Sequence, residues 1–245
     1  MTDRPVALLT VADWYVGPAL AHKLAPTHDL VLHLASGDEA PAELADLPTE
    51  IITVTGDVAT AEGNQAVVNA ALQRFGRIDA ASLLTGEIII GPFLDATTDQ
   101  WEKVKRANLD MVFHGLQAVL PPMIEAGVGQ IVVFTSATGA RPEPGVSLYG
   151  STRAGANAMV RAVGLEHAKA GVCVNAIGTN YMDFPGFIKA SGADDPERRK
   201  RIEAQVPAGR LGTMDELAEF ATVLLDGRSR FQTGQFFSYS GGWST

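Results

Sequence analysis

Three side chains with complementary proton chemistry lie close together in the chain: Ser136, Tyr149 and Arg153. Ser136 ends an apolar run that is expected to form a strand, and Tyr149 opens the helical segment that follows. Arg153 lies one helical turn after Tyr149, so both side chains project from the same helix face. A cation beside a phenol stabilises the phenolate, and a serine hydroxyl can hold a substrate oxygen against it. The pattern therefore indicates a general acid–base site directed at one oxygen.

Each of these residues also has an ordinary structural explanation. Ser136 can be a strand-end hydroxyl, Tyr149 a helix-start aromatic residue and Arg153 a solvated helix residue. Their order, and their places between the expected elements, favour the joint catalytic interpretation. The single cysteine, Cys173, excludes an intrachain disulfide, and its apolar run VCVNAI favours a buried strand residue over a nucleophile.

The elements that must position this site follow a regular alternation of short apolar runs and longer segments of helical period. This alternation predicts one α/β domain over residues 1–245, with a Rossmann-like doubly wound parallel sheet of about seven strands flanked by helices. The strands are expected at Val6–Thr10, Asp29–Leu34, Glu50–Thr55, Ala80–Leu84, Gly129–Thr135, Val172–Ile177 and Gln235–Ser238. The helices are expected near Gly17–Leu24, Glu62–Phe75, Thr98–Ala126, Leu148–Ala170 and Met214–Leu225. Residues 181–195 contain Pro185 and two glycines and are expected to be a loop that covers the site.

Composition narrows the class of protein. The net charge is −9, with 46% hydrophobic and 19% charged residues, so the chain is not expected to bind nucleic acid or an anionic membrane. The basic stretch PERRKRIEA around residues 198–201 is interpreted as a solvated helix face. The N-terminus lacks a signal-type pattern, and no apolar run reaches the length of a membrane span, which predicts a cytoplasmic location.

The turn after the first expected strand, TVADWYVG, departs from the glycine-rich turn of dinucleotide-binding folds. Val11 and Tyr15 stand where glycines would let the backbone approach a pyrophosphate. Asp13 adds a carboxylate near the electropositive start of the first helix, either as a cap or as a free charge. In both roles it opposes a bound phosphate.

The chain resembles the short-chain dehydrogenase/reductase superfamily over essentially its whole length. The similar stretches are Asp57-Val58, WEKVKRANLDMVFHG with Asn108, the Ser136–Tyr149 spacing, VNAI, VPAGRLGTMDELA and TGQFFSYSGGW. The departures are the altered first turn, Arg153 in place of a lysine, Leu34 in place of an acid, and Leu83-Leu84-Thr85-Gly86 in place of Asn-Asn-Ala-Gly. The departures at the first turn, at Leu34 and at Leu83-Leu84-Thr85-Gly86 each remove something that a nicotinamide cofactor would need.

Together these departures are similar to one branch of the superfamily, the halohydrin dehalogenases. That branch combines a Ser–Tyr–Arg triad with a first turn of Thr, four residues, Phe or Tyr, one residue and Gly, which Thr10, Tyr15 and Gly17 match here. The resemblance implies a carbon–halide lyase without cofactor or metal, which converts vicinal haloalcohols to epoxides with release of halide and a proton. It also implies the reverse opening of epoxides by halide, azide, cyanide or nitrite. Tyr149 would take the hydroxyl proton while Ser136 holds the oxygen and Arg153 supports Tyr149.

The same resemblance implies a pocket, a proton path and an assembly. The halide and substrate pocket would be formed by Thr10, Tyr15, Gly178, Thr179, Asn180, Tyr181, Met182 and Phe187. Asn108 and Thr85 are the candidate proton relay beside Arg153, and a role of Trp243 in lining a pocket stays open. The partners would be a small haloalcohol or epoxide, small anions, and further copies of the chain in a homotetramer.

Two other functions remain open from the sequence. The first is an NAD(P)-dependent reductase with an atypical arginine, which the retained Asp57-Val58 pair favours. The second is a catalytically silent descendant that binds a ligand or partner, which the intact Ser136, Tyr149 and Arg153 set opposes.

Overall fold

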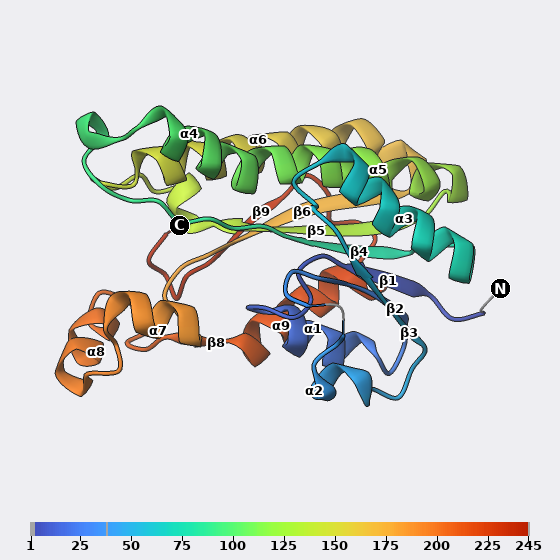
Figure 1. Ribbon diagram of the computed structural model, residues 1–245, viewed down its shortest axis with the longest axis horizontal. Helices are drawn as coiled ribbons and strands as arrows, with labels where there is room; N and C mark the ends of the chain where they lie inside the picture. Colours follow the sequence, from blue (N-terminus) through green and yellow to red (C-terminus); the bar gives the residue numbers. More distant parts are fainter. Residues whose placement is uncertain (1–2, 38, 245) are drawn as a thin grey trace.

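The computed structural model describes residues 3–37 and 39–244, which form one twisted parallel sheet between two helical layers (Figure 1). The sheet order is β3-β2-β1-β4-β5-β6-β9, and every neighbouring pair is parallel. The strands are β1 Val6–Leu9, β2 Asp29–Leu34, β3 Ile51–Thr55, β4 Ala80–Leu84, β5 Gly129–Ser136, β6 Val172–Thr179 and β9 Phe236–Tyr239. The order reverses direction at β1 and β4, so the carboxyl edge beside these two strands is the expected ligand position.

The helices cover both faces of the sheet. In Figure 1 the layer of α3, α4, α5 and α6 lies above the sheet, and α1, α2 and α9 lie below it. The helices are α1 Gly17–Leu24, α2 Ala42–Ala45, α3 Ala61–Phe75, α4 Thr98–Lys105, α5 Met111–Ala126, α6 Ser147–His167, α7 Pro185–Ser191, α8 Pro196–Glu203 and α9 Met214–Leu225. A small separate sheet pairs β7 Met182–Asp183 with β8 Gly212–Thr213, at the base of α7 and α8.

Alternate side chains of the buried strands fill two cores, one on each face of the sheet. One core joins the strands to α3, α5 and α6, and the other joins them to α1, α2 and α9. β5 is buried at every position because it lies inside the sheet and both of its faces are covered. Cys173 of β6 is buried, and burial raises the pKa of its thiol, so the prediction of a buried strand residue is confirmed.

All seven expected strands of the main sheet are present, and the predicted Rossmann-like architecture is confirmed. The helix expected over Thr98–Ala126 is divided into α4 and α5 by the π-helical turn Arg106–Asp110, which brings Asn108 into the interior. Residues 181–195 are not an irregular loop, because they contain β7 and α7. The basic stretch forms α8, which has no buried residue, as a solvated helix face requires.

The first turn follows a path that Gly17 makes possible. A Cβ at this position would lie within 2.5 Å of the carbonyl oxygen of Ala12, so the turn packs against the start of α1 only when residue 17 lacks a side chain. Within residues 3–37 and 39–244, no helix combines the length and the apolar character needed to cross a bilayer.

Candidate active site

The carboxyl ends of β5 and β6 bring the first two components of the site together. Ser136 is the last residue of β5 and pairs in register with Thr179, the last residue of β6. Gly178 allows this close packing, because a Cβ there would overlap the Phe236 ring and lie 3.0 Å from the carbonyl carbon of Ser136. The site edge is therefore set by backbone packing before any polar side chain contributes.

The hydroxyl of Ser136 is held by its own strand end. Its Oγ accepts from the backbone N–H of Thr138 at 3.2 Å and shares a hydrogen bond with Thr138 Oγ1 at 2.8 Å. It also donates to the carbonyl oxygen of Thr179 at 3.3 Å. Ser136 is buried, so these contacts fix its orientation at the strand end.

Tyr149 and Arg153 lie on one face of α6, as their spacing predicts. The guanidinium carbon of Arg153 is 5.1 Å from the ring centroid of Tyr149, in cation–π contact. Both side chains are buried. Among the residues that the structure describes, none accepts from or donates to the Tyr149 hydroxyl, which leaves this group available to a substrate oxygen.

Thr85 anchors the arginine. Arg153 Nη1 donates to Thr85 Oγ1 at 2.5 Å, and Nη2 donates to the Thr85 carbonyl oxygen at 3.1 Å. Arg153 Nε is buried without a partner, and no carboxylate of the described chain pairs with the guanidinium. The positive charge beside Tyr149 is thus not neutralised by an acid, and any negative charge formed on the reacting oxygen lies next to it.

Tyr15 joins this neighbourhood from the first turn. Its hydroxyl donates to Thr179 Oγ1 at 2.9 Å, and its ring packs against Phe184 with centroids 4.7 Å apart. Burial raises the pKa of Tyr15 well above its ordinary value, opposed by the Thr179 hydrogen bond, while Tyr149 adds to the increase and Arg153 reduces it. The Tyr15 hydroxyl is therefore a neutral hydrogen-bond donor at the ends of β5 and β6.

The conformation of the first turn replaces glycine geometry with bulky residues. Val11 and Tyr15 have φ values of 52° and 56°, in the left-handed region that glycine adopts without steric cost. Val11 is held there by His33, whose Nδ1 accepts the Val11 N–H at 3.0 Å while the ring contacts the Gly56 carbonyl oxygen at 2.9 Å. Because Nδ1 accepts, His33 carries its proton on Nε2 and donates it to Gly56.

Asp13 does not cap the first helix, whose N-cap is Val16, so that part of the expectation is corrected. Its carboxylate accepts from the backbone N–H groups of Ala35 and Ser36, each at 2.9 Å, and from the Ser36 hydroxyl at 2.5 Å. These contacts cross from the first turn to the chain just after β2. They lower the pKa of Asp13 despite the opposing effect of burial, which raises it.

The contacts of Tyr15 and Asp13 occupy the region where a nicotinamide dinucleotide would meet the first turn. Tyr15 covers the ends of β5 and β6, Asp13 occupies the N–H groups after β2, and the buried Leu34 replaces an acid there. Asp57, on the adenine side of the fold, forms an ion pair with Arg106. A dinucleotide bound across the first turn in the family's manner would have to displace Tyr15 and Asp13 from these contacts.

The remaining predicted pocket residues divide into two groups. Asn180, Tyr181 and Met182 line a hollow of about 210 Å³, which Ser238 and Ser240 also border. Phe187 of α7 contacts the Tyr181 ring edge-on, with centroids 6.2 Å apart. Thr10 is placed differently, because it is buried and its Oγ1 links β1 to β4 through Ser82 and Leu84. Thr10 therefore joins the end of β1 to β4 in this structure.

Of the two candidate relay residues, Thr85 contacts Arg153 directly and Asn108 does not. The Asn108 amide donates to the Glu87 carbonyl oxygen at 2.8 Å and to Thr152 Oγ1 at 3.4 Å, and accepts the Glu87 N–H at 3.1 Å. Asn108 thus holds the segment after β4 against α6, and a proton relay through it stays a prediction.

Two contacts at the site were not predicted from the sequence: that of Thr138 with Ser136, and that of Arg141 with Trp243. The contact of Thr138 could have been predicted, because a hydroxyl two residues after Ser136 can form a local hydrogen bond with it. Arg141 and Trp243 are separated by 102 positions in sequence, and no spacing rule predicts such a contact.

The fold and the Ser–Tyr–cation arrangement define a Rossmann-type domain with an oxygen-directed acid–base centre. A family profile described as "Enoyl-(Acyl carrier protein) reductase" matches residues 16–244. The chain therefore belongs to the short-chain dehydrogenase/reductase family.

Known relatives agree with this membership. The 2,5-dichloro-2,5-cyclohexadiene-1,4-diol dehydrogenase LinX of Sphingobium indicum is 29% identical over 245 residues, covering 98% of this chain and 96% of that protein. A 4-formylbenzenesulfonate dehydrogenase of Comamonas testosteroni is 30% identical over 188 residues, covering 76% of this chain and 75% of that protein. The crystal structure of levodione reductase has a TM-score of 0.91 at 27% identity, covering 97% of this chain and 96% of that one.

These findings overturn the prediction of a halohydrin dehalogenase, a cofactor-independent carbon–halide lyase acting on haloalcohols and epoxides. The matching family and the named relatives are reductases and dehydrogenases. The physical reason for the error is that a Ser–Tyr–cation set acts on an oxygen in the same way whichever bond breaks beside it. The triad therefore indicated the site chemistry and did not discriminate between the reactions.

Proposed function

We propose that this chain is a short-chain oxidoreductase that interconverts a small alcohol and the corresponding carbonyl compound. The observation that carries the acid–base part of the proposal is the buried Arg153 guanidinium, 5.1 Å from the Tyr149 ring and without an acid partner in the described chain. Relatives named as dehydrogenases and reductases support the reaction class.

The chain's own residues act at the substrate oxygen. Ser136 Oγ, held by the Thr138 N–H, turns its proton from the Thr179 carbonyl oxygen to the substrate oxygen, and the Tyr149 hydroxyl gives or takes the proton of that oxygen. Arg153, fixed by Thr85, supplies the neighbouring positive charge. In this reaction class NADH or NADPH supplies the hydride. Such a cofactor would bind here only after the first turn leaves the conformation described, in which Tyr15 and Asp13 occupy it, so the roles assigned here are confined to the substrate oxygen.

The test is a steady-state assay of the purified protein with small ketones, aldehydes and alcohols, and with the reduced and oxidised forms of both nicotinamides. Turnover is followed by nicotinamide absorbance. Tyr149→Phe is expected to lower kcat by about 10²–10⁴-fold, because it removes the proton-transferring hydroxyl. Arg153→Lys, which keeps a cation, is expected to lose less activity than Arg153→Met.

Ser151→Ala is the control, because it removes a hydroxyl from an exposed position of α6 and leaves Ser136, Tyr149 and Arg153 unchanged. Its kcat is expected to stay within about twofold of the wild-type value. Absence of turnover with either nicotinamide across the whole panel would contradict the proposed reaction. Equal activity of Tyr149→Phe and wild type would contradict the assigned role of Tyr149.

A further inference from the structure

Three segments that continue beyond the carboxyl edge of the sheet meet at one side chain, Trp243. Arg141, which follows β5, places its guanidinium carbon 4.6 Å from the Trp243 ring centroid and donates from Nη1 to the Trp243 carbonyl oxygen. Tyr181, which follows β6, meets the same indole edge-on with centroids 5.8 Å apart. Trp243 is 5% exposed, so a large ring of the segment after β9 is enclosed by two loops of the site.

The segment after β9 is itself fixed by a compact set of hydrogen bonds. The Trp243 N–H donates to the Ser240 carbonyl oxygen at 3.1 Å, and the Ser244 N–H donates to Ser240 Oγ at 3.0 Å. Ser238 Oγ of β9 donates to the Ser244 carbonyl oxygen at 2.7 Å. The indole is therefore presented from a rigid support.

The ring contact with Trp243 restrains Tyr181. Its φ of 55° lies in the left-handed region, which costs a residue with a Cβ free energy and needs surrounding contacts to persist. Its N–H donates to Asn180 Oδ1 at 2.9 Å, and its hydroxyl donates to Gln205 Oε1 at 3.1 Å. Its ring lies between Trp243 and Phe187 of α7, so the restraint passes from the edge of the sheet to α7.

We propose that Arg141 and Trp243 are positioning residues, which hold Tyr181 in its left-handed turn and thereby fix the Asn180–Phe187 wall of the substrate site. The expected kinetic effect of these residues depends on the proposed function. The restraint of Tyr181 depends only on the contacts described above. Ser136 also holds the start of this wall, because its Oγ contacts the carbonyl oxygen of Thr179, the residue before Asn180. Neither Arg141 nor Trp243 is assigned a contact with the reacting atoms.

Limited proteolysis tests the restraint of Tyr181 independently of any enzymatic activity of the protein. Lys189 is an exposed residue of α7, so trypsin cleavage there, mapped by mass spectrometry, reports how often the wall opens. Arg141→Gln and Trp243→Ala are expected to accelerate this cleavage by about fivefold, because both remove the cation–π contact, and Arg141→Gln also removes the guanidinium that donates to the residue 243 carbonyl oxygen. Trp243→Phe, which keeps an aromatic ring, is expected to restore part of the protection.

Matched controls are Arg228→Gln and Trp101→Phe, which change the same residue types away from the site and should leave the Lys189 cleavage rate unchanged. Variants are compared well below their thermal midpoints, so global unfolding does not contribute. An unchanged cleavage rate in both Arg141→Gln and Trp243→Ala would overturn the restraint, whatever the enzyme's activity.

Kinetics test the positioning role. With a substrate that the wild-type enzyme turns over, both variants are expected to raise KM by about fivefold and to leave kcat within about twofold, because the wall binds substrate while Tyr149 and Arg153 are untouched. Faster cleavage with unchanged KM would overturn the positioning role. If the wild type turns over nothing in the panel, the proposed function fails, and the restraint is still judged by the cleavage rates.

Discussion

Individual residues in strained backbone conformations mark this site. Among the residues described, the non-glycine residues with positive φ are Val11, Tyr15 and Tyr181, and all of them flank the carboxyl edge of the sheet. Such conformations persist only where surrounding contacts determine them, as His33, Thr179 and the Trp243 indole do here. The first turn and the segment after β6 are thus the two places where this chain departs most from relaxed geometry.

Replacing Tyr15 tests the obstruction of the first turn. Tyr15→Gly removes the ring and restores a residue suited to a φ of 56°, so the affinity for NADPH or NADH is expected to rise by about tenfold or more. Tyr15→Phe is the control, because it keeps the ring and loses only the Thr179 bond. Fluorescence titration of the reduced nicotinamide measures both. Equal affinities for wild type and Tyr15→Gly would show that the ring does not obstruct binding.

Thr85 carries a second prediction at this scale. Thr85→Val removes the hydroxyl that accepts from Arg153 Nη1 and leaves part of a buried guanidinium unpaired. The free energy of unfolding is expected to fall by about 1–3 kcal/mol, and kcat is expected to fall with it. Urea denaturation and the reductase assay measure these effects, with Thr85→Ser as the conservative control. A Val variant as stable as the Ser variant would contradict this role of the hydroxyl.

At the scale of elements, the site depends on how the end of β4 is held against α6. The π-helical turn Arg106–Asp110 directs Asn108 inward, where it pairs with both backbone polar groups of Glu87. Thr85 lies in the same segment after β4 and anchors Arg153 of α6. The irregular helical turn therefore positions Arg153 indirectly, through the backbone of the segment after β4.

Asn108→Ala tests this arrangement. It leaves the N–H and C=O of Glu87 without their side-chain partner, so the unfolding free energy is expected to fall by about 2–4 kcal/mol. Asn69→Ala, an exposed position of α3, is the matched control. The pH profile of kcat is recorded on the folded variant to examine the predicted proton relay. An unchanged rate and profile would leave Asn108 as a purely structural residue.

The sequence predicts elements better than contacts between them. The seven strands and the Tyr149–Arg153 helix face follow from local periodicity, and the structure contains them. The bonds from Asp13 to Ala35 and Ser36, and the stack of Arg141 on Trp243, depend on loops that converge only in the folded chain. The spacing of apolar residues along the chain does not indicate which loops meet in the folded structure. The choice of reaction failed for a related reason, because one oxygen-directed triad serves several chemistries.

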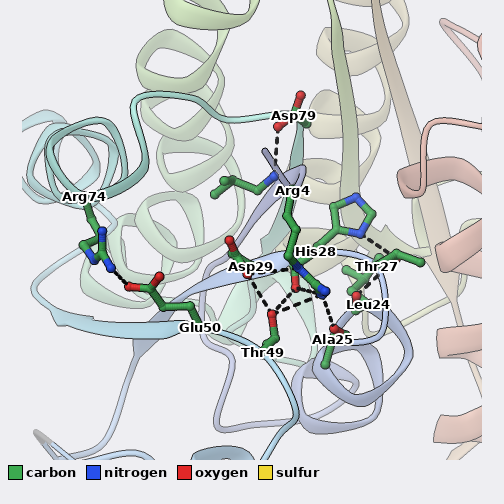
Figure 2. A network of polar contacts seen from close by, with 11 residues as sticks. Arg4, Leu24, Ala25, Thr27, His28, Asp29, Thr49, Glu50, Arg74 and Asp79 are labelled. Carbon is green, nitrogen blue, oxygen red and sulfur yellow. Dashed lines mark hydrogen bonds and ion pairs between the residues drawn. The ribbon is translucent and has the colours of Figure 1, made fainter. Parts of the chain in front are cut away.

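At the scale of the whole molecule, the amino-terminal edge of the sheet is a polar network remote from the site. Figure 2 shows Arg4 between α1, β2 and the start of β3, donating to the carbonyl oxygens of Ala25 and His28 and to Thr49. Asp79 accepts from the Val6 N–H in the same region. These contacts join β1, β2 and α1 at the amino-terminal edge of the sheet, and the candidate site lies at the opposite, carboxyl edge.

His28 makes this network sensitive to acid. Burial lowers its pKa below the ordinary value of 6.5, although Asp79 opposes the effect, so the folded state holds the ring neutral. The unfolded chain then binds a proton at a higher pH than the folded chain does. Stability is therefore expected to be fully present above pH of about 6.5 and to fall as the pH decreases toward the folded pKa.

Urea denaturation of wild type and His28→Gln between pH 7.5 and about 5 measures this dependence. His28→Gln is expected to flatten the decline, whereas His22→Gln, at an exposed position of α1, should keep it. A decline of equal slope in all three proteins would contradict the assignment to His28.

The sheet order has a consequence for the order in which the candidate site is assembled during synthesis. β9 is an edge strand that pairs only with β6 among the described strands, and it lies at residues 236–239, after every other element. A nascent chain can assemble β1 to β6 and place Ser136, Tyr149 and Arg153 before β9 leaves the ribosome. The indole of Trp243 arrives only afterwards. A chain that has folded as far as β6 would therefore contain Ser136, Tyr149 and Arg153, and would lack the contacts of Trp243 with Arg141 and Tyr181.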